Sequence, residues 1–451
     1  MTASAVHQTA PPQPGGWSRP ALDRLWDMAS RFASRLERVG YASYDPYDLW
    51  GTRYGRWSRK LYYAGNPLGV VLTAPVILTE ILCPRLRAVF VKKERFATAD
   101  AQLVLGFLNL HELSRRTAGR PATLAEGSRE QRDHLESPRG AEAASTSWLS
   151  KARELAEEIL GYSIPGYSGY CWGYPFDWQS ATGLKRKFTP HITATPYCFE
   201  AFIRLFDLTG EARYLEIARS IATFVFRDLR DTPTGEGAAA SSYFPDDATK
   251  VVNASAYRAW VLFEAASRCG IEEYRAKAWK NLRFILQSQQ PDGSWLYAVD
   301  DPAQRFIDHF HTCFVLKNLW KLNRHLGSEE VTRAIRNGYR YYRRALYDDQ
   351  GSPRQYAMRP RLQIVRLEMY DLAEAITLGA HLRDDIPEAF ALAQTLAGRL
   401  GDRYQLEDGH FVTRIYLGGI RHTLPYVRWP QAQLFLAITN LLQAASTSEV
   451  D

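Results

Sequence analysis

Residues 196–229 read PYCFEAFIRLFDLTGEARYLEIARSIATFVFRDL and contain two helical patterns joined by a glycine. Over 196–208 the large apolar side chains fall on one side of a helix, and a second helix is expected over 214–229. Gly210 suits the left-handed conformation that ends many helices, and Glu211 complements the N-terminus of the next helix. The stretch therefore predicts a helical hairpin with a tight turn.

This hairpin recurs along the chain. Gly270 and Gly327 follow Gly210 at intervals of 60 and 57 residues, and acidic residues stand after each of these glycines. A period of this length with two helices per unit indicates an array of helical hairpins. Twelve helices are expected, with starts near residues 21, 98, 148, 196, 214, 253, 274, 309, 331, 365, 387 and 429.

Six hairpins close into a ring if the helix over 21–39 packs against the helix over 429–445. An open solenoid is the alternative, but it would need polar capping repeats, and the last helix is as apolar as the middle ones. We therefore predict an all-α fold, an (α/α)6 toroid of about twelve helices. The inner helices are those expected to start near 98, 196, 253, 309, 365 and 429.

Five of the inner helices are preceded by long loops, which such a ring gathers at one mouth. These loops cover 162–195, 230–252, 290–308, 347–364 and 401–428. Since binding sites lie where loops converge, we expect the functional site at this mouth.

The domain organisation follows from composition. A single toroid domain is expected over 20–446. Residues 1–19 are rich in Ala, Gln, Pro and Gly, so we expect a disordered tail there and a short C-terminal tail over 447–451. Residues 115–146 have almost no large apolar side chains, which predicts an exposed, disordered insertion.

Charge and cysteine content narrow the function classes. The formal net charge of +7 is interpreted as spread along the chain, which favours an anionic ligand such as an acidic glycan over nucleic acid. The five cysteines are odd in number and show no C-x-x-C spacing. Neither a disulfide framework nor a metal site is indicated, and no cofactor is expected.

No signal peptide is visible in the sequence, because no cationic start is followed by an apolar run. The most apolar stretch, 68–82, has 15 residues and includes Pro75 and Glu80. It is shorter than a bilayer span, so we expect a buried segment and no membrane span. The protein is predicted to be cytoplasmic.

The loop over 169–197, GYCWGYPFDWQSATGLKRKFTPHITATPY, concentrates aromatic side chains beside a carboxylate and cations. Aromatic faces stack on sugar rings while charged groups bond to hydroxyls. An ordered lid packed on the fold is the alternative. The predicted substrate-binding residues, taken from this loop and the other mouth segments, are Trp172, Trp178, His191, Asp246, Asn253, Trp295, Arg366 and Arg428.

Several motifs resemble the six-hairpin toroid enzymes of polysaccharide metabolism, and most of all the VpsJ-like group of bacterial exopolysaccharide biosynthesis. They are YDPYD at 44–48, CWGYPFDWQ at 171–179, QQPDGSW at 289–295 and HFHT at 309–312. Asn253 and the His311-Thr312 pair are also distantly similar to glucuronyl C5-epimerases. The resemblance implies a polysaccharide or oligosaccharide substrate and contact with membrane-bound exopolysaccharide assembly machinery.

Glycosidic-bond cleavage needs an acid and a base or nucleophile on either side of the bond. Asp177 and Asp247 are the carboxylates predicted to supply them. A uronate lyase or C5-epimerase would instead use a base such as Tyr174, His309 or His311, with Asn253 and an arginine neutralising the sugar carboxylate.

His309 and His311 are two positions apart, so at most one of them is expected to face the mouth. A third interpretation is a noncatalytic glycan-binding or assembly protein that uses the same mouth. These three alternatives stay open at the level of sequence.

Overall fold

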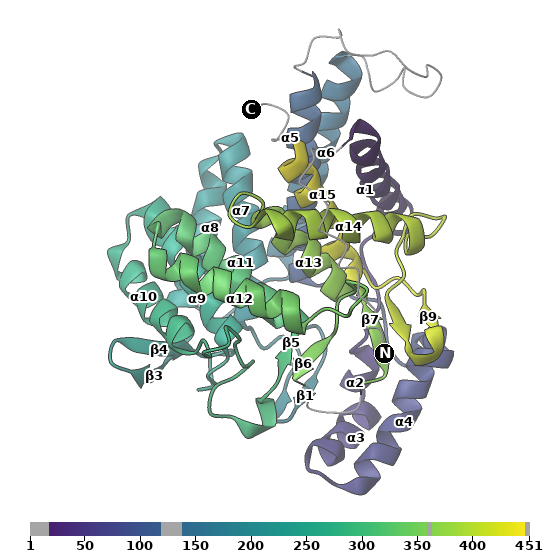
Figure 1. Cartoon of the computed structure of the whole chain (residues 1–451), viewed down its shortest axis with the longest axis vertical. Helices are drawn as coiled ribbons and strands as arrows, with labels where there is room; N and C mark the ends of the chain where they lie inside the picture. Colours follow the sequence, from purple (N-terminus) through teal and green to yellow (C-terminus); the bar gives the residue numbers. More distant parts are fainter. Residues whose placement is uncertain (1–17, 119–137, 359–362, 447–451) are drawn as a thin grey trace, which may run out of the picture.

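The computed structural model describes residues 18–118, 138–358 and 363–446, which are mainly helical (Figure 1). Six helices form an inner ring, in which each packs against the next and the last packs against the first. They are α5 (Ala97–Ala118), α7 (Thr195–Thr209), α9 (Val252–Cys269), α11 (His309–Leu326), α13 (Met369–His381) and α15 (Ala432–Ser446). The predicted (α/α)6 toroid is confirmed.

Six further helices form an outer ring, and each packs against an inner helix next to it in the chain or, for the first, against the last inner helix. They are α1 (Arg19–Val39), α6 (Pro138–Gly161), α8 (Ala212–Arg227), α10 (Glu272–Gln287), α12 (Glu329–Ala345) and α14 (Pro387–Arg403). The inner helices are enclosed by this layer. In α9 and α13 nearly every side chain is buried, as expected of helices with neighbours on all sides.

The glycines that end α7, α9 and α11 have the predicted left-handed conformation. The φ angles of Gly210, Gly270 and Gly327 are 71°, 68° and 56°. An L-residue adopts these angles at a cost, whereas glycine does not. The short turns between inner and outer helices therefore follow from local sequence.

The ring closes where the first outer helix meets the last inner helix. The ring of Phe32 in α1 lies 5.6 Å from that of Phe435 in α15 and 5.8 Å from that of Phe411. Phe32 is almost fully buried, so this contact joins residues about 400 positions apart into one core. The predicted pairing of the two terminal helices is confirmed.

Short antiparallel strands and single helical turns occupy the long loops. The strands are β1 (Trp178–Ser180), β2 (Gly183–Lys185), β3 (Asp231–Gly235), β4 (Ala238–Ser241), β5 (Ile307–Asp308), β6 (Tyr356–Met358), β7 (Val365–Glu368), β8 (Arg414–Tyr416) and β9 (Arg421–His422). The short helices are η1 (Pro84–Val89), η2 (Ile192–Ala194), η3 (Pro302–Gln304), η4 (Leu417–Gly419) and η5 (Val427–Gln431). These pairings fix the loops at the N-terminal ends of the inner helices.

Three element boundaries differ from the sequence prediction. Residue 365 begins strand β7, and α13 starts only at Met369, because β7 pairs with β8 in tertiary contact. Likewise α15 starts at Ala432 and not at 429, since η5 precedes it. The segment expected to be insertion over 115–146 is helical at both ends, in α5 and α6, while 119–137 lie outside the described residues. Of the N-terminal tail predicted over 1–19, Arg19 begins α1, while 1–17 lie outside the described residues. The C-terminal tail predicted over 447–451 also lies outside them.

The region over 41–82 holds the largest difference. It contains α2 (Asp48–Gly51), α3 (Arg53–Tyr63) and α4 (Pro67–Leu82). No helix was predicted to start in this region, and residues 68–82 were expected to be buried. Helix α4 is apolar but not buried, since large apolar side chains along it face outward. Figure 1 shows α3 and α4 as a hairpin that projects from the ring at its lower end.

The closing contact gives a test of the ring. Replacing Phe32 by Ala removes a ring that packs on two others, and we expect the free energy of unfolding to fall by about 3–5 kcal/mol. Val39→Ala, at the exposed end of the same helix, serves as the control and should change it by less than about 0.5 kcal/mol. Urea unfolding followed by circular dichroism measures both. Equal midpoints for the two variants would contradict closure through α1.

Candidate active site

Aromatic side chains from separate loops meet at the N-terminal end of the inner helices. The rings of Tyr370 and Trp429 are stacked with centroids 3.7 Å apart, and Phe310 meets both at 5.3 and 5.7 Å. Tyr47, from the YDPYD motif, lies 6.1 Å from Trp429. Residues 47 and 429 come from opposite ends of the chain, so the loops converge as the toroid requires.

The aromatic loop adds a second side to this mouth. Tyr174 lies 4.2 Å from the imidazole of His191, which in turn lies 5.6 Å from Tyr243. Phe176 connects Tyr174 to Tyr47, at centroid distances of 5.2 and 6.4 Å. The mouth is therefore surrounded by aromatic rings from several loops, which is a surface suited to sugar rings.

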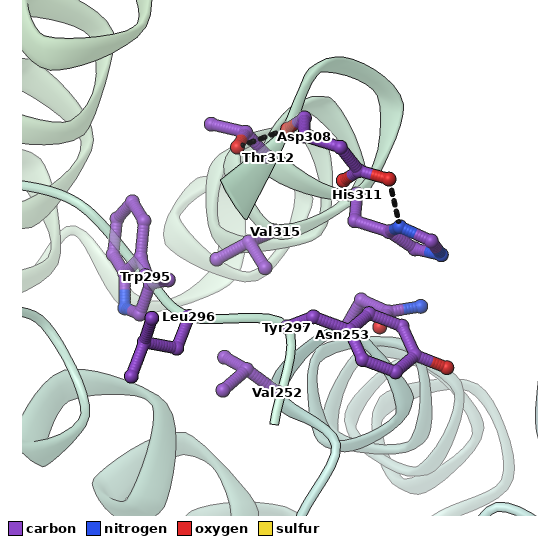
Figure 2. Close-up of a pocket in the computed structure, with 9 residues that line it drawn as sticks. All are labelled: Val252, Asn253, Trp295, Leu296, Tyr297, Asp308, His311, Thr312 and Val315. Carbon is purple, nitrogen blue, oxygen red and sulfur yellow. Dashed lines mark hydrogen bonds and ion pairs between the residues drawn. The ribbon is translucent and has the colours of Figure 1, made fainter. Parts of the chain in front are cut away.

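A small hollow opens beside these rings at the start of α9 and α11. It is lined by Val252, Asn253, Trp295, Leu296, Tyr297, Asp308, His311, Thr312 and Val315 (Figure 2). In Figure 2 the amide of Asn253, the hydroxyl of Tyr297 and the imidazole of His311 point to the same side. Three polar groups thus converge on one space.

His311 is oriented by a carboxylate. Its Nδ1 lies 2.7 Å from Oδ2 of Asp308, and the hydroxyl of Thr312 donates to the backbone oxygen of Asp308 at 2.7 Å. Asp308 is held in place because β5 pairs with β6 and because it precedes the first turn of α11. A carboxylate on Nδ1 fixes the tautomer and leaves Nε2 as a proton acceptor.

Asp371, in the first turn of α13, is the most unusual carboxyl of the mouth. It is buried, and within the described part of the chain neither of its oxygens has a hydrogen-bond partner. Burial, reinforced by the carboxylates of Glu368, Asp308 and Glu374, raises the pKa of Asp371 well above its ordinary value. Burial therefore favours the neutral, protonated form of this carboxyl, which can give up a proton.

Glu368 precedes Asp371 by one turn and is paired. It forms an ion pair with Arg414, its register partner between β7 and β8. Burial raises the pKa of Glu368, and Arg414 opposes this rise. The two neighbouring carboxyls thus differ, because Glu368 is paired with a cation and Asp371 has no partner among the described residues.

Asn253 is a further buried polar group that the fold leaves unsatisfied. It lies in the first turn of α9, and neither its amide oxygen nor its nitrogen has a partner among the described residues. A buried amide without partners is costly, so its presence at the hollow indicates a ligand contact. Of the residues predicted from the sequence, Asn253, Trp295 and His311 line this hollow.

The predicted acid Asp177 has a different environment. One of its oxygens pairs with Arg56 and with Arg186, the latter at 3.3 Å, and the other accepts the backbone N–H of Lys187 at 2.9 Å. These contacts tie the aromatic loop to α3. Asp177 thus holds the loop in place through these contacts, and its predicted catalytic role stays a prediction.

The two carboxylates of the second loop, over 230–252, also bond to neighbouring groups. Asp247 accepts backbone N–H groups of Tyr243 and Phe244 at 2.9 and 3.0 Å, and a hydroxyl bond from Thr249 at 3.1 Å. Asp246 is exposed and pairs with Lys185, whose hydrogen bond lowers the pKa of Asp246. Asp247 thus shapes the loop, and its predicted catalytic role stays a prediction.

Two tryptophans predicted to stack on sugar lie inside the core instead. Trp172 is 1% exposed and donates its indole N–H to the backbone oxygen of Ile159 at 2.9 Å. Trp295 is 3% exposed and donates to Ile285 at 2.9 Å, with only its edge at the hollow. Trp178 is half-buried, with Tyr47 at 4.8 Å and the guanidinium of Arg59 over its ring at 4.5 Å.

The other predicted residues divide between core and surface. His309 is buried away from the hollow and bonds through Nε2 to Tyr342 at 2.8 Å, so His311 is the one that faces the mouth. Burial lowers the pKa of His309, and likewise that of His191, to about 3. Arg428 is buried and paired with Asp48.

Arg366, on β7, is exposed outside the hollow. Tyr174 lies in the aromatic wall already described, and burial raises the pKa of its hydroxyl well above the ordinary value. It therefore contributes a neutral phenol to the mouth.

The sequence prediction did not select Asp371, Glu368 and Arg414. A signal for the first two exists in residues 368–374, EMYDLAE, where acidic residues recur every third position in a helix that is otherwise apolar. A helix enclosed on all sides has no reason to carry them unless they have partners or a function. Within the described residues, no three His, Cys, Asp or Glu side chains are arranged to hold a metal ion.

Comparison with known proteins gives no family for the sequence, since no family model and no curated protein matches it. Solved structures do match. An unsaturated glucuronyl hydrolase mutant from Streptococcus agalactiae has 10% identity and a TM-score of 0.52, over 98% of this chain and 97% of that chain.

Two further solved structures match a smaller share of this chain, at similarly low sequence identity. A cellobiose 2-epimerase from Bacillus thermoamylovorans has 10% identity and a TM-score of 0.55, over 78% of this chain and 87% of that one. A GH76 α-mannanase from Bacteroides thetaiotaomicron has 10% identity and a TM-score of 0.53, over 78% and 86%. Similarity at this level of identity establishes a shared fold, the six-hairpin toroid.

Proposed function

We propose that this protein is a carbohydrate-active enzyme that cleaves a glycosidic bond by acid–base catalysis at the mouth of the ring. The observation that carries the proposal is Asp371, a buried carboxyl without a partner whose pKa is raised well above its ordinary value. Departure of a sugar alkoxide requires a proton on the glycosidic oxygen, and a neutral carboxyl is the usual donor. The glucuronyl hydrolase, the α-mannanase and the cellobiose 2-epimerase that share the fold accord with this class.

In the proposed reaction, Asp371 protonates the glycosidic oxygen as the bond to the anomeric carbon breaks. His311, oriented by Asp308, takes a proton from the water that attacks the anomeric carbon. The products are a new reducing end and an alcohol. His311 then releases the proton it took from water to solvent, and Asp371 regains one from solvent. Trp429 and Phe310, which are both part-exposed, supply the faces on which the sugar ring stacks.

A second candidate is a lyase or epimerase that removes a proton from a sugar carbon. The observation that favours it is the His311–Asp308 pair, with the ring of Tyr297 at 4.5 Å from the imidazole. Such a reaction on a uronate needs a cation for the sugar carboxylate, and Arg414, a cation beside the mouth, is paired with Glu368. We therefore rank hydrolysis of a neutral sugar first.

The substrate is proposed to be a bacterial exopolysaccharide or its oligosaccharide precursor, processed in the cytoplasm. This part of the proposal is supported by the motifs at 44–48 and 171–179. Their residues Tyr47 and Phe176 both contribute rings to the mouth.

The proposal predicts the behaviour of two variants at the mouth. Asp371→Asn retains the shape but cannot donate a proton, and His311→Asn cannot accept one, so each should lower kcat by about 10²–10⁴-fold. The assay incubates the protein with neutral and acidic exopolysaccharides and follows new reducing ends, unsaturated uronate and deuterium uptake at sugar carbons. Deuterium uptake or unsaturated product without reducing ends would favour the second candidate.

Asp177→Asn is the matched control, because it removes a carboxylate at the same end of the ring. It should retain kcat within about threefold while the free energy of unfolding falls by about 1–3 kcal/mol through lost charged hydrogen bonds. Wild-type activity in Asp371→Asn, or loss of activity only in Asp177→Asn, would contradict the assignment.

The pKa of Asp371 also predicts a dependence of stability on pH. Above pH 3.8, its ordinary pKa, the unfolded chain loses this proton while the folded chain keeps it, so wild-type stability falls as pH rises. Asp371→Asn avoids this loss and should gain up to about 1.4 kcal/mol on the wild type per pH unit, until the raised pKa is reached. Chemical unfolding between pH 4 and about pH 8 measures the difference. If the stabilities of the wild type and of Asp371→Asn changed in parallel with pH, the pKa of Asp371 would be ordinary.

A further inference from the structure

Helix α4 exposes its large apolar residues and buries small and polar ones, which is the reverse of a surface helix in a soluble protein. The residues that it buries are small or polar apart from one valine: Gly69, Thr73, Val76 and Glu80. The residues that it exposes are large and apolar: Leu68, Val70, Val71, Leu78 and Leu82. Gly69 is needed where it stands, because a Cβ there would lie 2.3 Å from the backbone nitrogen of Tyr62 in α3. The hairpin is thus packed with its apolar face outward.

The same surface continues onto the neighbouring elements. Tyr54 and Trp57 of α3 and Leu86 and Val89 of η1 are exposed, as is Phe90 after it. Of the nineteen large apolar side chains that are exposed in the described chain, ten lie between residues 54 and 90. A contiguous patch of this kind on a soluble fold indicates an interaction site.

The positive charge of the protein is concentrated in the same segment. Residues 53–93 have eight Lys and Arg but one acidic residue, which gives +7, the net charge of the whole chain. The expectation that the charge is spread along the chain is corrected accordingly. The single acidic side chain, Glu80, is buried, and exposed cations flank the patch at Arg53, Lys60, Arg85, Lys92 and Lys93.

The hairpin is held firmly at the loop end of the ring. Glu80 pairs with Arg87, accepts a hydrogen bond from Tyr426 at 2.9 Å and lies 3.3 Å from His422. Arg56 of α3 pairs with Asp177 of the aromatic loop. The apolar patch is therefore presented by a fixed element close to the mouth, which Figure 1 shows at the same lower end as β1.

We propose that the patch over residues 54–93 docks this protein on the surface of an anionic lipid membrane. The large side chains would enter the boundary between headgroups and acyl chains, and the flanking cations would meet lipid phosphates. Helix α4 has 16 residues and contains Pro75, and at about 1.5 Å per residue it is shorter than the ~30 Å hydrocarbon core. No described helix is long and apolar enough to cross a bilayer, so the hairpin lies on the surface.

Flotation of the full-length protein with vesicles tests the proposal. We expect binding to phosphatidylcholine vesicles that contain phosphatidylglycerol, weakening as salt is added. Val71→Ser with Leu78→Ser should weaken binding at least about tenfold, because both side chains leave the apolar boundary. Lys92→Gln with Lys93→Gln should weaken binding to the anionic vesicles by about tenfold or more.

Val39→Ser is the matched control, an exposed apolar residue outside the patch, and should bind as the wild type does. Thermal melting checks that all variants are folded, since the substituted side chains are exposed. The proposal would be overturned if the wild type did not bind the anionic vesicles, or if the Val71/Leu78 variant bound them as well as the wild type does. Self-association in solution that this variant abolishes without any vesicle binding would also overturn it, and would make the patch an interface between copies.

Discussion

Enclosure of the six inner helices is the constraint on which the rest of the structure depends. Once α1 packs on α15, the inner helices are shut off from solvent except toward the two ends of the ring, so a polar group on one must find a partner or open onto an end. Lys317 and Glu374 satisfy this by pairing at the centre. Asp371 and Asn253 do not, and both lie in the first turn of an inner helix. Both of these unsatisfied groups thus lie at the mouth.

The ring could be predicted from sequence because its signals are local: the apolar period of each helix and the glycine that ends it. The roles of loop residues could not, because they depend on partners far along the chain. Asp177 has the composition of a catalytic carboxylate in an aromatic loop, yet its partner Arg56 lies 121 positions away. Asp371 was accessible to sequence reasoning, as an acid in a helix with no exposed face, but the start of α13 was placed four residues early.

Helix α4 shows where hydropathy alone is ambiguous. An apolar stretch of this length predicts burial in a protein core, but the same composition suits a surface that meets lipid. Only the structure shows that Gly69 and Thr73 face α3 while Leu78 faces outward. With the mouth and the hairpin at one end of the ring, an enzyme docked in this way would hold its site close to the membrane surface.

The account rests most directly on the protonation state of Asp371. Infrared difference spectroscopy of the wild type against Asp371→Asn at neutral pH detects the carbonyl stretch of a neutral carboxyl in an apolar environment. We predict a band from a protonated carboxyl that the variant lacks and that persists until the pH exceeds the raised pKa. A carboxylate pair of bands in its place would show that Asp371 is ionised, and would contradict a proton-donating acid at the mouth of the ring.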